Sequence, residues 1–195
     1  MKRFSIVLGL FLAGLSLAPS TMQKRATRSY GIALAPGDPA PAVRGTSPAG
    51  EPVVVRWEDH ALTIVNFWAF WCVPCKAEMP VLQDLHDRRG QDGLEIVGIE
   101  MGAGKEQNGR RFLSDLGIKY PVVRGQEDTA VAWGGVTILP TTFFVGRDGK
   151  ILRKFVGAPP AQLEAMAKDA DAILEGRPLG VQPDPDVAPA PAGKP

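Results

Sequence analysis

The sequence predicts a single α/β domain built on a mixed β-sheet with helices on both faces. Apolar strand segments alternate with helical segments through the middle of the 195-residue chain, which is typical of a parallel sheet. An Asp148-Gly149 turn signal between two late strand segments adds an antiparallel edge. The two cysteines of the chain, Cys72 and Cys75, stand where a strand gives way to a helix, which is typical of a redox site.

The first predicted elements lead to these cysteines and beyond them. Val53–Val55 indicates a short first strand. Leu62–Trp68 is a nearly continuous apolar run, as expected for a central strand buried on both faces. A helix is predicted from Val73 to about Arg89, because apolar residues recur at helical spacing and Gly90 is a stop signal. The apolar residues at this spacing are Val73, Ala77, Val81 and Leu85.

The remaining elements continue the alternation, then add a hairpin and a last helix. Apolar runs define the strands, and Gly and Pro signals mark the element ends. The predicted elements are strand Leu94–Glu100, helix Lys105–Leu116, strand Tyr120–Val123, helix Glu127–Trp133, strands Thr141–Val145 and Ile151–Val156, and a helix from Pro159-Pro160 to near Glu175.

The two ends of the chain differ in composition from the domain between them. Residues 1–20 begin with two basic residues and an apolar run, as in a signal peptide or an N-terminal anchor. Residues 21–50 are expected to form an extended lead-in, residues 51–176 the domain, and residues 177–195 a disordered Pro/Ala-rich tail. The net charge is +1 with no basic stripe, so nucleic acid is not an expected partner.

The C-x-x-C motif predicts specific chemistry for each cysteine. A helix start offers unpaired N–H groups and a partial positive charge, which lower the pKa of a thiol placed there. Cys72 is therefore expected to be the exposed nucleophile and Cys75, one turn later, the resolving thiol. Pro74 fits the first helical turn, where a backbone N–H is dispensable. Trp71 is expected to shield the thiols and to join Val73 and Pro74 in a surface for docking partners.

Other uses of two thiols remain as alternatives. A structural zinc site would need two more ligands, and haem attachment would need a histidine at Lys76. An inert structural disulfide closing so short a loop would stabilise the fold little. A peroxidase of the same fold would carry its reactive cysteine in a Pro/Thr-rich loop before the helix, and this sequence has no such loop there. The main alternative is a copper(I)-handling metallochaperone that uses both thiolates.

Two segments resemble a known family. The stretch from Asn66 to Pro80, which includes Trp71-Cys72-Val73-Pro74-Cys75, is similar to the active-site segment of the thioredoxin superfamily, and more narrowly to exported TlpA/ResA-type thiol–disulfide reductases. Leu139–Val145, followed by Arg147-Asp148-Gly149, resembles the second landmark of that family. The resemblance implies a thioredoxin-like fold, with the segment from Met101 to Trp133 as an insertion of the TlpA/ResA type.

The resemblance also implies roles for residues outside the C-x-x-C motif. Pro140 is expected in the cis form, facing the dithiol, with the Leu139 backbone pairing with a substrate chain. Glu78 is either a solvated surface residue or, as in the TlpA/ResA branch, an acid near the thiols that assists proton transfer. Asn66 stands where cytoplasmic thioredoxins carry a buried aspartate, which makes Glu78 the natural substitute for that acid.

The expected function is that of an exported protein-disulfide oxidoreductase, acting as a reductant and without a metal or organic cofactor. The expected location is the periplasm or the outer side of the cell envelope, in soluble or anchored form. The expected partners are disulfide-containing exported proteins, with cytochrome c maturation and copper-site assembly as candidate pathways. A membrane thiol-transfer protein is the electron donor that the resemblance implies, and the protein is expected to be a monomer.

Overall fold

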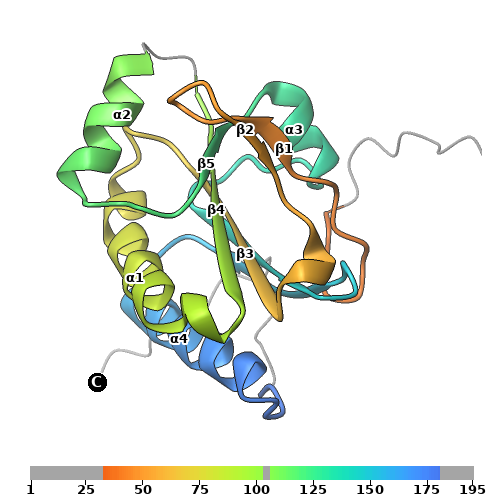
Figure 1. The fold of residues 1–195 in the computed structure, drawn as a ribbon. Coiled ribbons are helices and arrows are strands. Elements are labelled where there is room, and N and C mark those ends of the chain that lie inside the picture. The colour runs from red at the N-terminus through yellow and green to blue at the C-terminus, as the bar shows by residue number, and fades with distance from the viewer. Residues whose placement is uncertain (1–32, 103–105, 181–195) are drawn as a thin grey trace, which may run out of the picture.

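A five-stranded mixed sheet forms the centre of the computed structural model, which describes residues 33–102 and 106–180 (Figure 1). Strands β3, β4 and β5 are parallel, whereas β6 is antiparallel to β3, and β7 is antiparallel to β6. The predicted mixed sheet is confirmed. In spatial order, the strands are β5 (Val122–Arg124), β4 (Leu94–Glu100), β3 (Leu62–Trp68), β6 (Thr141–Gly146) and β7 (Ile151–Val156).

Helices cover both faces of this sheet (Figure 1). On one face lie α1 (Val73–Arg89), α2 (Glu106–Asp115) and α4 (Pro160–Leu174). On the other face lie α3 (Glu127–Ala132) and a small two-stranded sheet. The small sheet pairs β1 (Arg44–Thr46) with β2 (Pro52–Val54), and short 3-10 turns occupy Trp57–Asp59 and Gly90–Asp92.

Alternate side chains of β3 enter two separate apolar layers. Leu62, Ile64 and Trp68 pack in the layer beneath α1 and α4, while Val65 and Phe67 pack in the opposite layer. All seven residues of β3 are buried, as expected for a central strand with both faces covered. Asn66 has the same parity as Ile64 and Trp68, so its amide points into the layer that contains α1.

The packed structure begins earlier in the chain than the expected boundary at residue 51. In the described part of the expected lead-in, turns close at Asp38 and Gly50, Pro39 forms a bridge with Lys150, and Val43 is buried in the second apolar layer. The β1 strand also lies within this segment. The predicted signal or anchor at residues 1–20 lies outside the described residues, as do positions 181–195 of the predicted tail.

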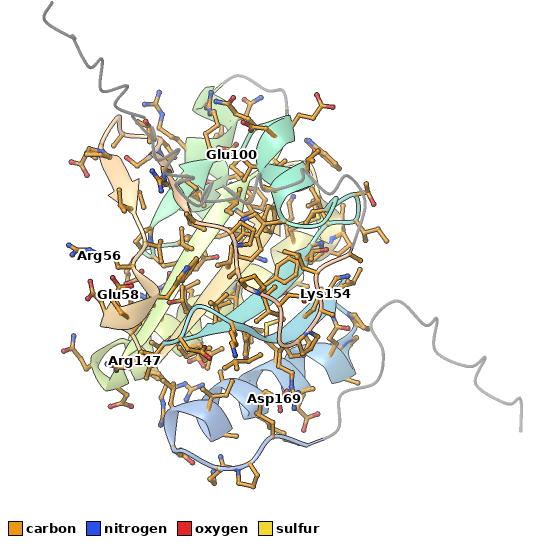
Figure 2. The ribbon with its side chains drawn as sticks, turned by 90° about the vertical axis from the view of Figure 1, so that its right-hand side faces the viewer. Arg56, Glu58, Glu100, Arg147, Lys154 and Asp169 are labelled. Atoms are coloured by element: carbon orange, nitrogen blue, oxygen red, sulfur yellow. A yellow bond between two sulfur atoms is a disulfide. The ribbon has the colours of Figure 1, made fainter. Side chains whose placement is uncertain are left out.

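Side-chain hydrogen bonds attach two peripheral segments, α4 and the turn at Trp57–Asp59, to the strands or turns of the sheet. Figure 2 labels Asp169 on α4, and Arg147 and Glu58 at the second contact. The Arg153 side chain on β7 donates from Nε to Asp169 on α4 at 2.7 Å. Arg147, in the turn between β6 and β7, donates from Nη1 to the Glu58 carbonyl at 3.3 Å. The positively charged β7 side chain therefore helps to hold α4 against the sheet.

The buried face of α1 differs from the apolar stripe in the sequence. Val73 and Ala77 are exposed and Val81 is only half-buried, so of that stripe only Leu85 is fully buried. The face that meets the sheet includes one acid, Glu78, because α1 begins at the cysteines and Cys75 must face inward. The buried residues of α1 are Cys75, Glu78, Met79, Leu82, Gln83 and Leu85.

Candidate active site

The Cys72–Cys75 disulfide lies at the first turn of α1, where β3 has just ended. Cys72 is the N-cap residue, and its Sγ accepts a hydrogen bond from the Cys75 N–H at 3.2 Å. A thiolate at Cys72 would receive the same bond together with the positive end of the helix dipole. The site therefore favours negative charge on Cys72 rather than on Cys75.

The two sulfur-bearing residues differ in access to solvent. Cys72 is 4% exposed and Cys75 is fully buried. We expected an exposed nucleophile, but in the disulfide state Cys72 is nearly covered and is only the more accessible of the pair. An incoming thiolate can therefore approach Cys72 more readily than Cys75, which is the order that nucleophile and resolving thiol require.

Large apolar side chains lie exposed next to Cys72 in sequence and in the loop before β6. Trp71 and Val73, which flank Cys72, are 60% and 73% exposed, and Ile138 is 57% exposed. Trp71 stands against Gly102, where a Cβ atom would lie 3.1 Å from the indole Nε1, so the loop after β4 supports the ring. Pro74 is also exposed. Exposed apolar side chains that gather at one site are typical of protein-docking surfaces.

The loop before β6 carries the cis peptide bond Leu139–Pro140 that we expected. Pro140 is buried, and its carbonyl accepts a hydrogen bond from the Gly157 N–H at 2.8 Å. The Thr141 hydroxyl donates to the Ile138 carbonyl at 2.8 Å. Leu139 packs against both apolar layers, one of which contains the cysteines. Thr142, two residues after Pro140, donates to Glu78 on α1, so this loop leads to the helix that carries the disulfide.

Glu78 lies in a closed ring of hydrogen bonds with two other buried side chains. Asn66 Nδ2 donates to Glu78 Oε2 at 2.7 Å and to Thr142 Oγ1 at 2.9 Å. The Thr142 hydroxyl donates to Glu78 Oε1 at 2.8 Å. All three residues have no solvent exposure. The interpretation of Glu78 as a solvated surface residue is therefore wrong, since its carboxyl lies inside the domain, one turn after Cys75.

Burial changes the acidity of this carboxyl. Loss of solvation raises the pKa of Glu78 from its ordinary value of 4.5 to about 7, although the bonds from Thr142 and Asn66 act in the opposite direction. Tyr120 is also buried, and this burial raises the pKa of its hydroxyl, with a smaller contribution from the charge of Glu78. A carboxyl with a pKa near neutrality can both take up and release a proton at physiological pH.

Two residues of the site were missed by sequence reasoning. Thr142 lies in the strand Thr141–Gly146, where a polar side chain in a fully buried strand is the one available signal. Ile138 precedes the Leu139-Pro140 pair and gave no signal, because an apolar residue in a loop is usually at least partly covered. Lys76 is exposed, with its Nζ 5.9 Å from the centre of the Phe112 ring, and Met79 is buried in the core.

Neither a metal cluster nor a membrane-spanning helix is found in the described part of the chain. Within residues 33–102 and 106–180, no three His, Cys, Asp or Glu side chains gather in a group that could hold a metal ion. Over the same ranges, no helix combines the length and apolar character needed to cross a bilayer.

The comparisons with known proteins agree with this geometry. Residues 36–154 match the model of the AhpC/TSA family. The chain belongs to the AhpC/TSA family. Among curated members of similar sequence, the thiol:disulfide interchange protein HelX of Rhodobacter capsulatus is 34% identical over 160 residues, which cover 80% of this chain and 85% of HelX. The thiol-disulfide oxidoreductase ResA of Geobacillus thermodenitrificans is 32% identical over 125 residues, which cover 60% of this chain and 71% of ResA.

A solved structure extends the likeness to the fold. The structure of a thiol:disulfide interchange protein of the thioredoxin family from Chlorobium tepidum superposes with a TM-score of 0.61 at 29% identity, covering 76% of this chain and all of that one. The predicted thioredoxin-like fold is thereby confirmed. The similar proteins are named thiol-disulfide oxidoreductase or thiol:disulfide interchange protein, and this chain carries the Cys72–Cys75 disulfide at the start of α1; it is a thiol–disulfide oxidoreductase.

Proposed function

We propose that the protein is an exported reductant of disulfides in partner proteins. The observation that carries the proposal is the asymmetry of the dithiol at the start of α1. Cys72 is the N-cap and the more accessible residue, whereas Cys75 is sealed below it, one turn from a buried carboxyl. Such an asymmetry separates the residue that meets the partner from the residue that releases it.

In the proposed reaction, the reduced enzyme gives two electrons to a partner disulfide. The Cys72 thiolate attacks one partner sulfur, and the bond between the two partner sulfurs breaks to leave one partner thiolate and a mixed disulfide. Cys75 then loses its proton and attacks the Cys72 sulfur. The mixed disulfide breaks, the second partner thiolate leaves, and the enzyme is left with the Cys72–Cys75 disulfide.

Glu78 is proposed as the group that accepts the Cys75 proton in the second step. Cys75 and Glu78 are three residues apart on α1, so they are neighbours on the same side of the helix. Both are fully buried, which leaves bulk water poorly placed to take the proton. The pKa of Glu78, raised by burial to about 7, is closer to that of a thiol than an ordinary carboxyl pKa is, which makes the transfer less unfavourable.

A partner polypeptide is proposed to dock across the apolar surface beside the disulfide. Trp71, Val73 and Pro74 would cover one side of the partner cysteine, while the backbone of Leu139, before the cis Pro140, would pair with the partner chain. Ile138 extends this surface next to Leu139. Together they offer apolar contact with little charge, which suits many sequences around a cysteine.

The setting of this activity is proposed from family resemblance. Exported TlpA/ResA-type reductases include the thioredoxins of cytochrome c maturation, and this supports apocytochrome c as a substrate, with copper-site assembly proteins as the alternative. A membrane thiol-transfer protein would return the enzyme to its reduced form. These assignments place the reaction in the periplasm or at the outer side of the cell envelope.

The proposal predicts opposite outcomes for the two cysteine variants. Cys72→Ser should abolish reduction of insulin disulfides, because no nucleophile reaches the substrate. Cys75→Ser should stop turnover but accumulate a mixed disulfide with the partner at Cys72, because the resolving step is lost. Mass spectrometry of complexes trapped in cells by Cys75→Ser would identify both the partner and the attached cysteine. The assignment would be reversed if Cys72→Ser trapped complexes at Cys75 while Cys75→Ser trapped none at Cys72.

A further inference from the structure

The side-chain amide of Asn66 occupies an unusual position in the buried ring around Glu78. Its Nδ2 makes two hydrogen bonds, to Glu78 Oε2 at 2.7 Å and to Thr142 Oγ1 at 2.9 Å. Its Oδ1 is buried and has no hydrogen-bond partner among the described residues. One end of the amide is therefore fully used, and the other end is a buried acceptor without a donor.

These bonds fit the ionised form of Glu78. A carboxylate only accepts hydrogen bonds, and here it accepts one from Asn66 and one from Thr142. When the carboxyl is protonated on Oε2, its O–H points at an amide N–H₂ group, which cannot accept. The protonated form then leaves two donors facing each other inside the domain, which is costly. A partner that serves both forms of Glu78 must offer an acceptor as well as a donor.

We propose that Asn66 is a positioning residue whose amide turns end for end when Glu78 takes up a proton. After the turn, Oδ1 lies where Nδ2 was and accepts from the protonated Glu78 Oε2, and the Thr142 hydroxyl swings from Oε1 to donate to Oδ1. The turn is about the Cβ–Cγ bond of Asn66, a torsion with a broad and roughly two-fold profile. No bond forms or breaks in this step apart from hydrogen bonds.

The distances allow both arrangements without a shift of the backbone. The amide of Asn66 lies 2.7 Å from Glu78 Oε2 and 2.9 Å from Thr142 Oγ1. Both distances suit an N–H···O bond and also an O–H···O bond. Asparagine has the right chemistry because it presents a donor and an acceptor in the same shape. An aspartate in its place would bring a second negative charge beside Glu78, and a leucine would supply neither bond.

The inference rests on the proposed function for its catalytic meaning, but not for its physical test. If Glu78 accepts the proton of Cys75, the turn of Asn66 keeps the new carboxylic acid hydrogen-bonded until the proton leaves. The carboxyl then keeps a partner of the right kind at Oε2 in both of its forms, while the end of the amide that faces away from Glu78 has no partner among the described residues. Asn66 would thus contribute to catalysis without contacting either sulfur in the proposed steps.

The test is an NMR titration of the full-length oxidised protein labelled with ¹⁵N and ¹³C, from pH 5 to pH 9. The oxidised form is used because its disulfide does not titrate. The Tyr120 hydroxyl also faces Glu78, but burial and the charge of Glu78 raise its pKa, so it stays protonated across this range. The Glu78 carboxyl ¹³C shift reports ionisation, and NOEs from the Asn66 amide protons to Thr142 side-chain protons report orientation. We expect these NOEs at high pH and their loss at low pH, with one midpoint for both signals. NOEs that stay constant while Glu78 titrates would overturn the proposal and assign the adjustment to the Thr142 hydroxyl.

Variants separate this inference from the proposed role of Glu78. In Glu78→Gln, the Asn66 pattern should no longer change with pH, and a change that persists would show that the turn is not coupled to Glu78. Asn66→Leu should slow reductase turnover by at least about tenfold. Gln83→Leu is the matched control, because Gln83 is another buried amide that contacts Asp87 and Lys119 rather than Glu78. Equal losses of reductase turnover in Asn66→Leu and Gln83→Leu would mean that Asn66 acts only through the stability of the fold.

Failure of the Asn66 inference and failure of the proposed proton-transfer role of Glu78 give different results. A fully active Glu78→Gln enzyme, together with a wild-type amide that turns, would remove the proton-transfer role and leave the Asn66 inference standing. An inactive Glu78→Gln enzyme with an amide that never turns would do the opposite. Because the wild-type titration needs no variant, the proposal remains testable even where Asn66→Leu does not fold.

Discussion

At the scale of single residues, the carboxyl of Glu78 was the least predictable part of the site. The sequence placed it on the same side of the helix as Cys75, but it could not decide between solvent and core. That decision depends on which face of α1 meets the sheet, and the face is fixed by Cys75 together with Met79 and Leu82 rather than by the apolar stripe at Val73. A glutamate on a helix is usually a surface residue, so the sequence left the solvated and the buried alternatives both open.

Glu78→Gln should change how stability depends on pH. The pKa of Glu78 is about 7 in the folded protein and near 4.5 when unfolded, so between these values the folded state holds the extra proton. The contribution of Glu78 to stability is therefore fully present below about pH 4.5 and is lost as the pH rises through 7. Urea unfolding of the oxidised protein should show wild type losing on the order of 3 kcal/mol relative to the variant between pH 4.5 and 8.

The same variant, when reduced, tests proton transfer. Removal of a negative charge near the dithiol should lower the pKa of at least one thiol, and removal of the base should slow insulin reduction. Alkylation rate against pH and reductase turnover measure the two effects. Parallel stability curves combined with unchanged alkylation and turnover would mean that Glu78 stays ionised and takes no part in the reaction.

At the scale of elements, periodicity and apolar runs predicted most of the secondary structure. The predicted bounds of β3, α1, β4 and β7 agree with the structure. The strand β1 was missed, because Arg44-Gly45-Thr46 has no apolar residue and forms its ladder only by pairing with β2. Edge pairing of this kind depends on a partner strand, and therefore a local pattern does not reveal it.

Gly98 on β4 is expected to be intolerant of a side chain. A Cβ atom there would lie 2.8 Å from the indole Nε1 of Trp68, which is fully buried and stacked on Phe112 with ring centres 5.2 Å apart. Because the indole has no free space, Gly98→Ala should lower the free energy of unfolding by about 1–3 kcal/mol.

Gly90 supplies the matched control for this substitution. It has helical φ and ψ of −55° and −40° at the end of α1, and a Cβ atom there would meet nothing within 4 Å. Gly90→Ala should leave stability unchanged or raise it by up to about 1 kcal/mol, because alanine restricts the unfolded chain. Urea unfolding of both variants measures the contrast, and equal effects would contradict the close packing inferred around Trp68.

At the scale of the whole molecule, the site joins segments that are far apart in sequence. The antiparallel register of β3 and β6 places Thr142 opposite Asn66, and α1 brings Glu78 over both. The C-x-x-C motif predicted the disulfide, and the family resemblance of the Leu139–Val145 segment predicted the cis form of Pro140, because each feature belongs to one short segment. The ring of Asn66, Glu78 and Thr142 depends on strand register and helix rotation together, neither of which can be obtained from local sequence.

The redox poise of the whole protein is expected to be reducing. Reduction potential depends on how strongly the folded protein stabilises the reduced dithiol, and strong oxidants do so with a group that favours the thiolate. Val73 and Pro74 supply no charged or hydrogen-bonding side chain between the cysteines. We therefore expect a potential below about −200 mV, in the range of thioredoxin rather than that of DsbA.

Equilibration with glutathione buffers, followed by tryptophan fluorescence or thiol labelling, would measure this potential. Pro74→His should raise it, because a histidine between the cysteines would stabilise the Cys72 thiolate and hence the reduced form. Pro80→Ala is the control, since Pro80 is an exposed proline of the same helix, outside the C-x-x-C motif. A wild-type value near −120 mV would contradict the reductase proposal, because the enzyme would then accept electrons from partner thiols more readily than it gives them.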